Sequence, residues 1–198
     1  MADVAHASPD TRPGLVICAW EPAETAWDPI EDLSGEPWNP AGAQTDPLAA
    51  DEPGPLADAL ITRLADPRRR ALLLVGRTRN GDSFRLQIRA ENRTIDGMGR
   101  LDDSGPAVVR TTAPAAEMVQ ALRDAGLAAE ATSEAEGDAG SYLLYRVLSA
   151  LPDEADAPAV GLLRAPLSAS DAAVQRGVKA AAQAMARHLS PLPRSRPT

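Results

Sequence analysis

Leu15-Val16-Ile17-Cys18-Ala19 and Ala71-Leu72-Leu73-Leu74-Val75 decide the fold class of this chain. Both stretches are continuous apolar runs bounded by turn residues, which is the pattern of strands buried on both faces. Such strands are typical of parallel sheets that helices cover on each side. Residues 170–189 supply a covering helix, because their apolar residues recur along one stripe: Val174, Val178, Ala181, Met185 and Leu189.

Shorter segments extend this alternation of strands and helices. Strands are predicted over residues 84–90, 107–111, 127–132 and 158–163, and a helix over 142–151. Pro114 is suited to the first position of another helix, for which Gly126 is the stop signal. The fold class is therefore predicted to be α/β, a three-layer α/β/α arrangement around a mostly parallel twisted sheet.

With 198 residues and 44% hydrophobic content, the chain can bury one sizeable core. We expect a single α/β domain over residues 1–193, with its first strand at 14–20 and a flexible tail at 194–198. Residues 21–55 are rich in Pro, Asp and Gly and are predicted to form a long loop.

All the tryptophans of the chain lie in or beside this loop: Trp20, Trp27 and Trp38. A disordered linker rarely concentrates indoles, so we expect the loop to fold back over a pocket or a partner surface. The alternative is that the rings cover a thin edge of the core.

Composition excludes several classes of function. A net charge of -8 argues against a nucleic-acid partner, because no basic stripe is available to displace counterions. Cys18 is the single cysteine, so no internal disulfide can form, and with two distant histidines it makes no metal site. No cofactor is expected. The chain has no apolar run long enough to span a bilayer and no secretory signal, so we expect no membrane association and a cytoplasmic location. One lysine and abundant alanine indicate a GC-rich, bacterial genome.

Several motifs follow one another in order along most of the chain: Ala19-Trp20-Glu21-Pro22, Gln87-Ile88-Arg89-Ala90-Glu91-Asn92, Thr111-Thr112-Ala113-Pro114, Ala139-Gly140-Ser141-Tyr142-Leu143-Leu144-Tyr145 and Gly161-Leu162-Leu163-Arg164-Ala165-Pro166. Together they resemble pyroglutamyl peptidase I, also called pyrrolidone-carboxylate peptidase, of cysteine peptidase family C15. The resemblance implies the α/β fold of that family. It also implies that Trp20 replaces an aromatic residue of the pocket for the pyroglutamyl ring.

The three catalytic positions of that family are occupied by other residue types. Leu144 falls on the nucleophilic cysteine, Arg164 on the general-base histidine and Gln87 on the acidic third member. A leucine side chain cannot attack a carbonyl, and a guanidinium is not deprotonated in proteins. Because nucleophile and base act as a unit, the resemblance implies a diverged homologue without thiol peptidase activity and with no catalytic residue by inheritance.

The old pocket is expected to bind a small acidic or amide-bearing ligand or a peptide terminus. Arg164 beside Gln87 would offer a fixed positive charge next to an amide. The candidate ligand-binding residues are Trp20, Trp27, Trp38, Gln87, Asn92, Ser141, Tyr142 and Arg164. In the alternative interpretations, Ser141 caps the helix that follows it, and Arg164 pairs with Asp138 or Glu136 and holds the site closed.

Three classes of function remain open. The first is a catalytically inactive binding protein. The second is a repurposed enzyme that performs a tailoring or cyclising step of a biosynthetic pathway by positioning and electrostatics. The third is a scaffold or accessory subunit that uses the loop from Trp20 to Trp38 as its contact surface. A homo-oligomer is compatible with each. A closed pocket favours the third class, and an open pocket favours the first two.

Overall fold

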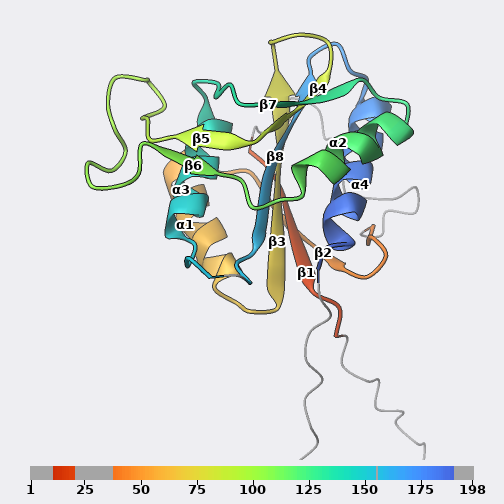
Figure 1. The fold of residues 1–198 in the computed structure, drawn as a ribbon, viewed down its shortest axis with the longest axis horizontal. Coiled ribbons are helices and arrows are strands. Elements are labelled where there is room, and N and C mark those ends of the chain that lie inside the picture. Colours follow the sequence, from red (N-terminus) through yellow and green to blue (C-terminus); the bar gives the residue numbers. More distant parts are fainter. Residues whose placement is uncertain (1–10, 21–37, 155, 190–198) are drawn as a thin grey trace, which may run out of the picture.

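The computed structural model describes residues 11–20, 38–154 and 156–189 (Figure 1). Its main sheet has the strand order β2-β1-β3-β8-β4-β7. The bounds of these strands are Gly14–Ala19 (β1), Gln44–Leu48 (β2), Arg69–Thr78 (β3), Phe84–Gln87 (β4), Ala129–Thr132 (β7) and Ala159–Pro166 (β8). All neighbours pair in parallel except β8 and β4, which are antiparallel. The predicted mostly parallel sheet is confirmed.

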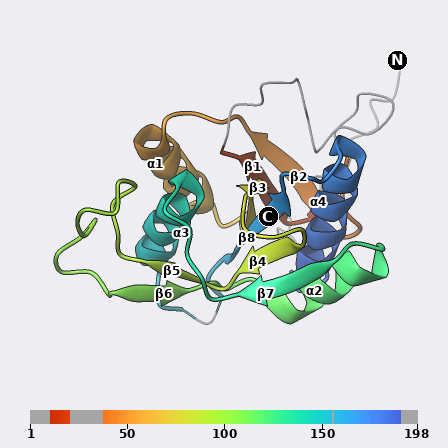
Figure 2. The same cartoon turned by 90° about the horizontal axis from the view of Figure 1, so that it is seen from above.

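Two pairs of helices enclose this sheet. Figure 2 shows α1 (Pro53–Leu64) and α3 (Ala139–Ala150) on one side, and α2 (Ala115–Asp124) and α4 (Asp171–Ala186) on the other. The three layers predicted from the sequence are therefore confirmed. None of the helices in the described residues is long and apolar enough to cross a membrane.

The apolar runs are continuous because successive side chains of each strand point to opposite faces of the sheet and both faces are buried. Leu15 and Ile17 pack toward α2 and α4, whereas Val16 and Cys18 pack toward α1 and α3. In β3, Leu73 likewise belongs to the core under α2 and α4, and its neighbours belong to the core under α1 and α3. Each fully buried aliphatic side chain of this kind contributes about 1.5–3 kcal/mol to folding.

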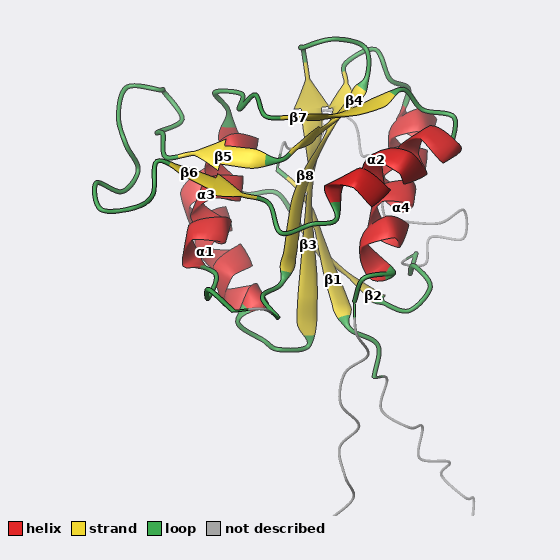
Figure 3. Ribbon diagram, viewed as in Figure 1, coloured by secondary structure: helices red, strands yellow, loops and turns green. Residues whose placement is uncertain are grey.

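The predicted strand over residues 84–90 is divided in two, which corrects the prediction. Only β4 joins the main sheet, and β5 (Arg89–Glu91) pairs with β6 (Val108–Arg110) in a separate antiparallel ribbon. The break falls at Ile88, whose amide donates to the Thr132 carbonyl while its own carbonyl accepts from the Thr111 amide. Figure 3 shows this ribbon beside α3, with the loop between its strands projecting from the body. Residues 89–110 are called the arm below.

The region 21–55 also departs from the prediction of a long loop. Its described part, residues 38–55, contains the edge strand β2 and the first turn of α1. Pro47 is tolerated in β2 because an edge strand has one side without a partner. Pro53 stands at the start of α1, where a missing amide costs nothing. Trp27 lies outside the described residues.

Other boundaries shift by a few residues. The helix predicted from Pro114 begins at Ala115, with Pro114 as its N-cap, and ends before Gly126, which has a φ of 76°. The helix predicted from residue 142 begins at Ala139.

Candidate functional site

The residues at the three family positions come from three elements. Arg164 lies near the carboxyl end of β8, Gln87 is the last residue of β4, and Leu144 lies in the second turn of α3. Each is 0% exposed. Arg164 follows Leu162 by two positions, so its side chain points into the same layer, between the sheet and α3.

Arg164 is held by hydrogen bonds from its guanidinium to three neighbours. Its two terminal nitrogens bind the two carboxylate oxygens of Asp138, one of them at 2.8 Å. Gln87 Oε1 accepts from Nε at 3.2 Å and from a terminal nitrogen at 3.1 Å. Ser141 Oγ accepts from the guanidinium at 3.0 Å and donates to Gln87 Oε1 at 3.2 Å. These four residues are called the Arg164 cluster below.

Trp20 covers the Arg164 cluster. Its ring centroid is 5.3 Å from the guanidinium carbon of Arg164, in cation–π geometry, and the residue is 3% exposed. The ring lies in a slot between Gly76 and Gly140, where a Cβ on either residue would approach indole carbons to less than 3.0 Å. Only glycine fits at these two positions, so the close approach of strand, helix and indole depends on both.

Asp138 has a second structural role. It is the N-cap of α3, and its Oδ1 accepts a hydrogen bond from the Ser141 amide at 2.9 Å. Ser141 is therefore not the cap, as the alternative interpretation had it, but a residue inside the first turn. A carboxylate at this point also interacts favourably with the positive end of the helix dipole.

A second buried arginine stands next to the cluster. Arg85 is the direct partner of Arg164 in the β4–β8 ladder, and like charges in that position repel. Carboxylates from the loop before α3 offset the repulsion: Glu134 binds Arg85 at 2.7 Å, and Glu136 lies 3.8 Å from Arg85 and 3.7 Å from Arg164. The sequence reasoning missed Arg85, although its place two residues before Gln87 on one strand was a usable signal.

Leu144, which stands at the position of the family nucleophile, has apolar surroundings. Leu144 packs with Leu143, Val147 and Leu162 in the core under α1 and α3. Cys18 lies in the same core, and burial raises the pKa of its thiol to about 12. A thiol with that pKa is almost entirely protonated at neutral pH, so it does not replace the missing nucleophile.

The remaining candidates lie apart from the Arg164 cluster. Asn92 fastens the loop of the arm: its Oδ1 accepts from the Leu101 and Asp102 amides, and its amide group donates to the Asp102 carbonyl at 2.6 Å. Trp38 packs on the opposite face of the sheet, against the core under α2 and α4, and lies 5.6 Å from the Lys179 ammonium.

Tyr142 is half-buried and lies beside two residues of the Arg164 cluster. Its hydroxyl accepts a hydrogen bond from Arg146 at 2.9 Å. With Asp138 and Ser141 it lines a cavity of about 20 Å³, which has room for a single water molecule. The structure thus brings together Trp20, Gln87, Ser141 and Arg164, and the cavity that the described residues form beside Asp138 and Ser141 is far smaller than a ligand.

Comparison with solved structures identifies the fold. Pyrrolidone carboxyl peptidase from Thermus thermophilus matches with a TM-score of 0.68 and 18% identity, covering 86% of this chain and 98% of that chain. Pyroglutamyl peptidase I from Bacillus amyloliquefaciens matches with a TM-score of 0.70 and 16% identity, covering 89% and 96%. A mutant pyrrolidone carboxyl peptidase from Pyrococcus furiosus matches with a TM-score of 0.72 and 15% identity, covering 89% and 100%.

The chain therefore has the fold of the pyrrolidone carboxyl peptidases. The resemblance drawn from the sequence motifs is confirmed at the level of the fold, at a sequence identity of 15–18%. No protein-family model matches the sequence, and no curated protein matches it.

The chemistry available in the Arg164 cluster is limited. It contains one cation, one carboxylate, one amide and one hydroxyl, and the last three are each hydrogen-bonded to the cation. Arg164 does not accept a proton, and the Ser141 hydroxyl donates to the neutral Gln87 amide oxygen and not to a carboxylate, so no base in the cluster is bonded to it. Among the described residues, no group of three or more His, Cys, Asp or Glu is placed to hold a metal ion.

Proposed function

We propose that this protein is a non-hydrolytic relative of the pyrrolidone carboxyl peptidases that acts as an accessory or scaffold protein. The observation that carries the proposal is the state of Arg164, which is 0% exposed and bonded to both oxygens of Asp138. This is the closed alternative that the sequence analysis described, and it favours the third class of function.

The same geometry supports the proposed loss of thiol peptidase activity. A thiol peptidase needs a nucleophile and a base within hydrogen-bond reach of each other and of a substrate carbonyl. Leu144 and Arg164 supply neither group, and Trp20 covers the cluster. Hydrolysis by the mechanism of the family would require a thiol nucleophile and a base, and these positions contain neither.

Binding of an acidic ligand at Arg164 would require Asp138 to leave. Asp138 already occupies the guanidinium as a ligand carboxylate would, and it also caps α3. An incoming carboxylate would therefore have to compensate for both the lost ion pair and the lost cap. This competition disfavours a receptor role for the old pocket.

The arm supplies a surface suited to protein contact. It exposes three large apolar residues: Ile95 at 41%, Met98 at 86% and Val108 at 44%. Exposed apolar side chains on a projecting element are available for contact with another protein. The first partner to test is a second copy of the chain, because the arm carries charges of both signs and two arms related by a two-fold axis can pair opposite charges.

The proposal is tested first by assaying hydrolysis of a fluorogenic pyroglutamyl amide. We expect no turnover above the buffer rate. The matched control is the triple variant Gln87→Glu, Leu144→Cys and Arg164→His, in which any gained hydrolysis supports the motif assignment. Saturable hydrolysis by the unaltered protein that is lost on Arg164→Ala would overturn the proposal.

The contact surface is tested by sedimentation velocity over a range of concentrations. We expect self-association of the unaltered protein, and we expect Met98→Ser to weaken it because the most exposed apolar side chain of the arm is removed. The control is Leu167→Ser, which removes an exposed apolar side chain outside the arm. Identical sedimentation of the unaltered protein and the Met98 variant would exclude the arm as the contact surface.

One observation favours ligand binding as a second candidate function. Trp20 Nε1 is buried and has no hydrogen-bond acceptor among the described residues. A buried donor without an acceptor costs about 1–3 kcal/mol, which a ligand carbonyl would recover. Titration of the Trp fluorescence with pyroglutamate or glutamine tests this candidate, because a bound carbonyl beside the indole would change the emission.

A further inference from the structure

The loop of the arm presents a methionine to solvent. Met98 is 86% exposed, whereas Met118 and Met185 are 0% exposed and belong to the core under α2 and α4. Met1 lies outside the described residues. Within residues 11–20, 38–154 and 156–189, Met98 is therefore the one methionine whose sulfur an oxidant in solution reaches without unfolding of the core.

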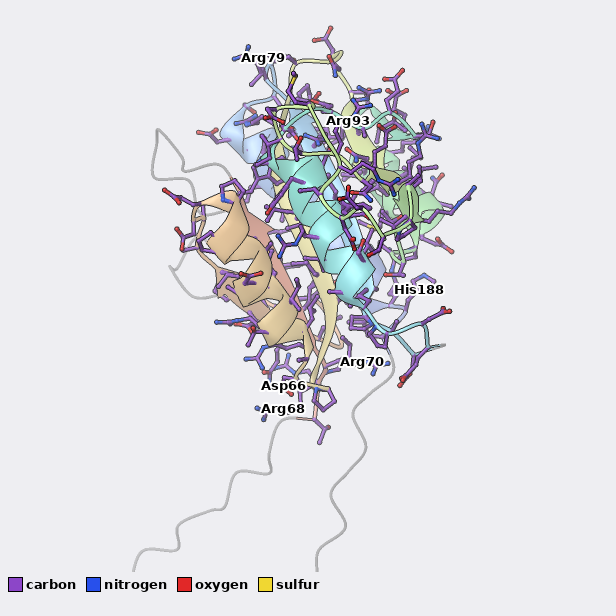
Figure 4. All side chains as sticks on the ribbon, turned by 90° about the vertical axis from the view of Figure 1, so that its left-hand side faces the viewer. Asp66, Arg68, Arg70, Arg79, Arg93 and His188 are labelled. Atoms are coloured by element: carbon purple, nitrogen blue, oxygen red, sulfur yellow. The ribbon has the colours of Figure 1, made fainter. Side chains whose placement is uncertain are left out.

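The neighbours of Met98 leave its side chain uncovered. Gly97 and Gly99 flank it and carry no side chains. Beyond the adjoining residues of the chain, a Cβ on Gly99 would meet no heavy atom within 4 Å, and a Cβ on Gly97 would meet only Arg93 Cδ, at 3.8 Å. Figure 4 views the molecule from the side of the arm and labels Arg93, whose guanidinium is held by Glu91 at 3.2 Å.

The turn that carries Met98 is held by groups other than the methionine side chain. Asp96 Oδ1 accepts from the Thr94 hydroxyl at 2.6 Å and from the Met98 amide at 3.0 Å. The Gly99 amide donates to Thr94 Oγ1 at 3.0 Å. A chemical change at the sulfur of Met98 would therefore alter the surface of the arm and leave these hydrogen bonds in place.

We propose that Met98 is an oxidation site, and that its conversion to methionine sulfoxide weakens the contact between two arms. The inference rests on the proposed function, in which the arm is the contact surface. A sulfoxide is polar, so its burial in an apolar contact is unfavourable. Ile95 and Val108, the other exposed apolar residues of the arm, contain no sulfur, so Met98 alone of the three would respond.

The oxidant is a peroxide, and hydrogen peroxide is the simplest example. A lone pair of the thioether sulfur attacks one peroxide oxygen, so that an S–O bond forms as the O–O bond breaks. The sulfur loses two electrons, which the peroxide gains. The proton of the transferred oxygen passes to the departing hydroxide, which leaves as water. Methionine sulfoxide reductases reverse the change, so the contact would be restored by reduction.

The proposal is tested by treating the full chain with hydrogen peroxide, locating the added oxygen by peptide mass spectrometry, and measuring self-association by sedimentation velocity. We expect Met98 to be oxidised before Met118 and Met185. We expect oxidation to weaken self-association by about tenfold or more, because burial of one methionine side chain corresponds to at least that factor in an equilibrium constant. Treatment with the two methionine sulfoxide reductases, one for each epimer, should restore it.

Met98→Leu and Met98→Gln are the matched variants. Leu keeps an apolar side chain without sulfur, so the association of Met98→Leu, whatever its strength, should not change with peroxide. Gln is polar like the sulfoxide, so Met98→Gln should associate weakly with or without peroxide. A loss of association in peroxide-treated Met98→Leu equal to that of the unaltered protein would place the sensitive group elsewhere and overturn the proposal.

Two further outcomes separate this inference from the proposed function. Unchanged association of protein that is fully oxidised at Met98 would overturn the inference alone, provided that Met98→Ser still weakens the contact. Absence of self-association before peroxide is added would overturn the proposed arm contact and this inference with it.

Discussion

Asp138 is the residue whose replacement tests the closed site most sharply. In Asp138→Asn the side-chain oxygen that caps α3 is kept, because Asn is as good an N-cap as Asp, but the charge that faces Arg164 is removed. Arg164 then remains 0% exposed with Gln87 and Ser141 as its hydrogen-bond acceptors and with Glu136, 3.7 Å away, as the remaining carboxylate. The variant therefore separates the ion pair from the cap.

The expected loss of stability follows from the burial of the pair. Removing one partner of a buried ion pair costs about 3–5 kcal/mol. The Asp138 side chain is 28% exposed, so water screens it in part and the lower end of that range, about 3 kcal/mol, applies. Asp138→Ala also removes the cap and should cost about 1 kcal/mol more.

The assay is urea unfolding followed by tryptophan fluorescence, with the free energy of unfolding taken from the linear extrapolation. Adding Arg164→Met to Asp138→Asn removes the buried cation that has lost its hydrogen-bonded carboxylate, so the double variant should be more stable than Asp138→Asn alone. A change below about 0.5 kcal/mol in Asp138→Asn would refute the account, because it would mean that Arg164 has no need of this carboxylate.

Three further changes test other parts of the structure. Gly76→Ala should destabilise the protein by about 1–3 kcal/mol in the same unfolding assay, because its Cβ would overlap the Trp20 ring, whereas Gly54→Ala, which has open space around it, should not. Cys18, whose thiol pKa burial raises to about 12, should react with DTNB only after unfolding; rapid reaction of the native protein would contradict its burial. Hydrogen bonds from the hydroxyl and the amide of Ser104 lower the pKa of Asp102 from 3.8, so they should stabilise the loop of the arm above about pH 4 and fade as the pH falls below it. Heteronuclear NOE values in that loop that do not change between pH 6 and pH 3 would show that these bonds do not order it.

Much of the fold could be predicted because a strand that is buried on both faces is a continuous apolar run in the sequence. The apolar runs of β1 and β3 and the stripe of Val174 and Val178 in α4 are local patterns. α1 was not predicted, although Leu56, Leu60 and Leu64 recur along one helical stripe, because the preceding Pro and Asp residues dominate the composition there.

The candidate site was predictable only in part. The motif resemblance implied that Arg164 lies beside Gln87, and in the structure these two residues are hydrogen-bonded to each other and to Ser141. Whether Arg164 faced a pocket or an internal carboxylate was left open by the sequence, because that choice depends on the path of the loop that ends at Asp138.

The sequence also does not show which face of the sheet each tryptophan covers. Trp20 and Trp38 are close in sequence, but they pack on opposite faces of the sheet, in the cores under α3 and under α4 respectively. Closeness in sequence across a long connection carries no information about which face a ring will cover. Arg85 was not among the predicted site residues, because the sequence alone does not give the strand register that places it opposite Arg164.

A crystal structure determined in the presence of saturating pyroglutamate is the most direct test of the central claim, that the Arg164 cluster is closed by the protein's own carboxylate. The account predicts that Asp138 still binds Arg164 through both oxygens, with Trp20 over the guanidinium and no pyroglutamate between them. Pyroglutamate bound to Arg164, with Asp138 displaced from it, would contradict the claim.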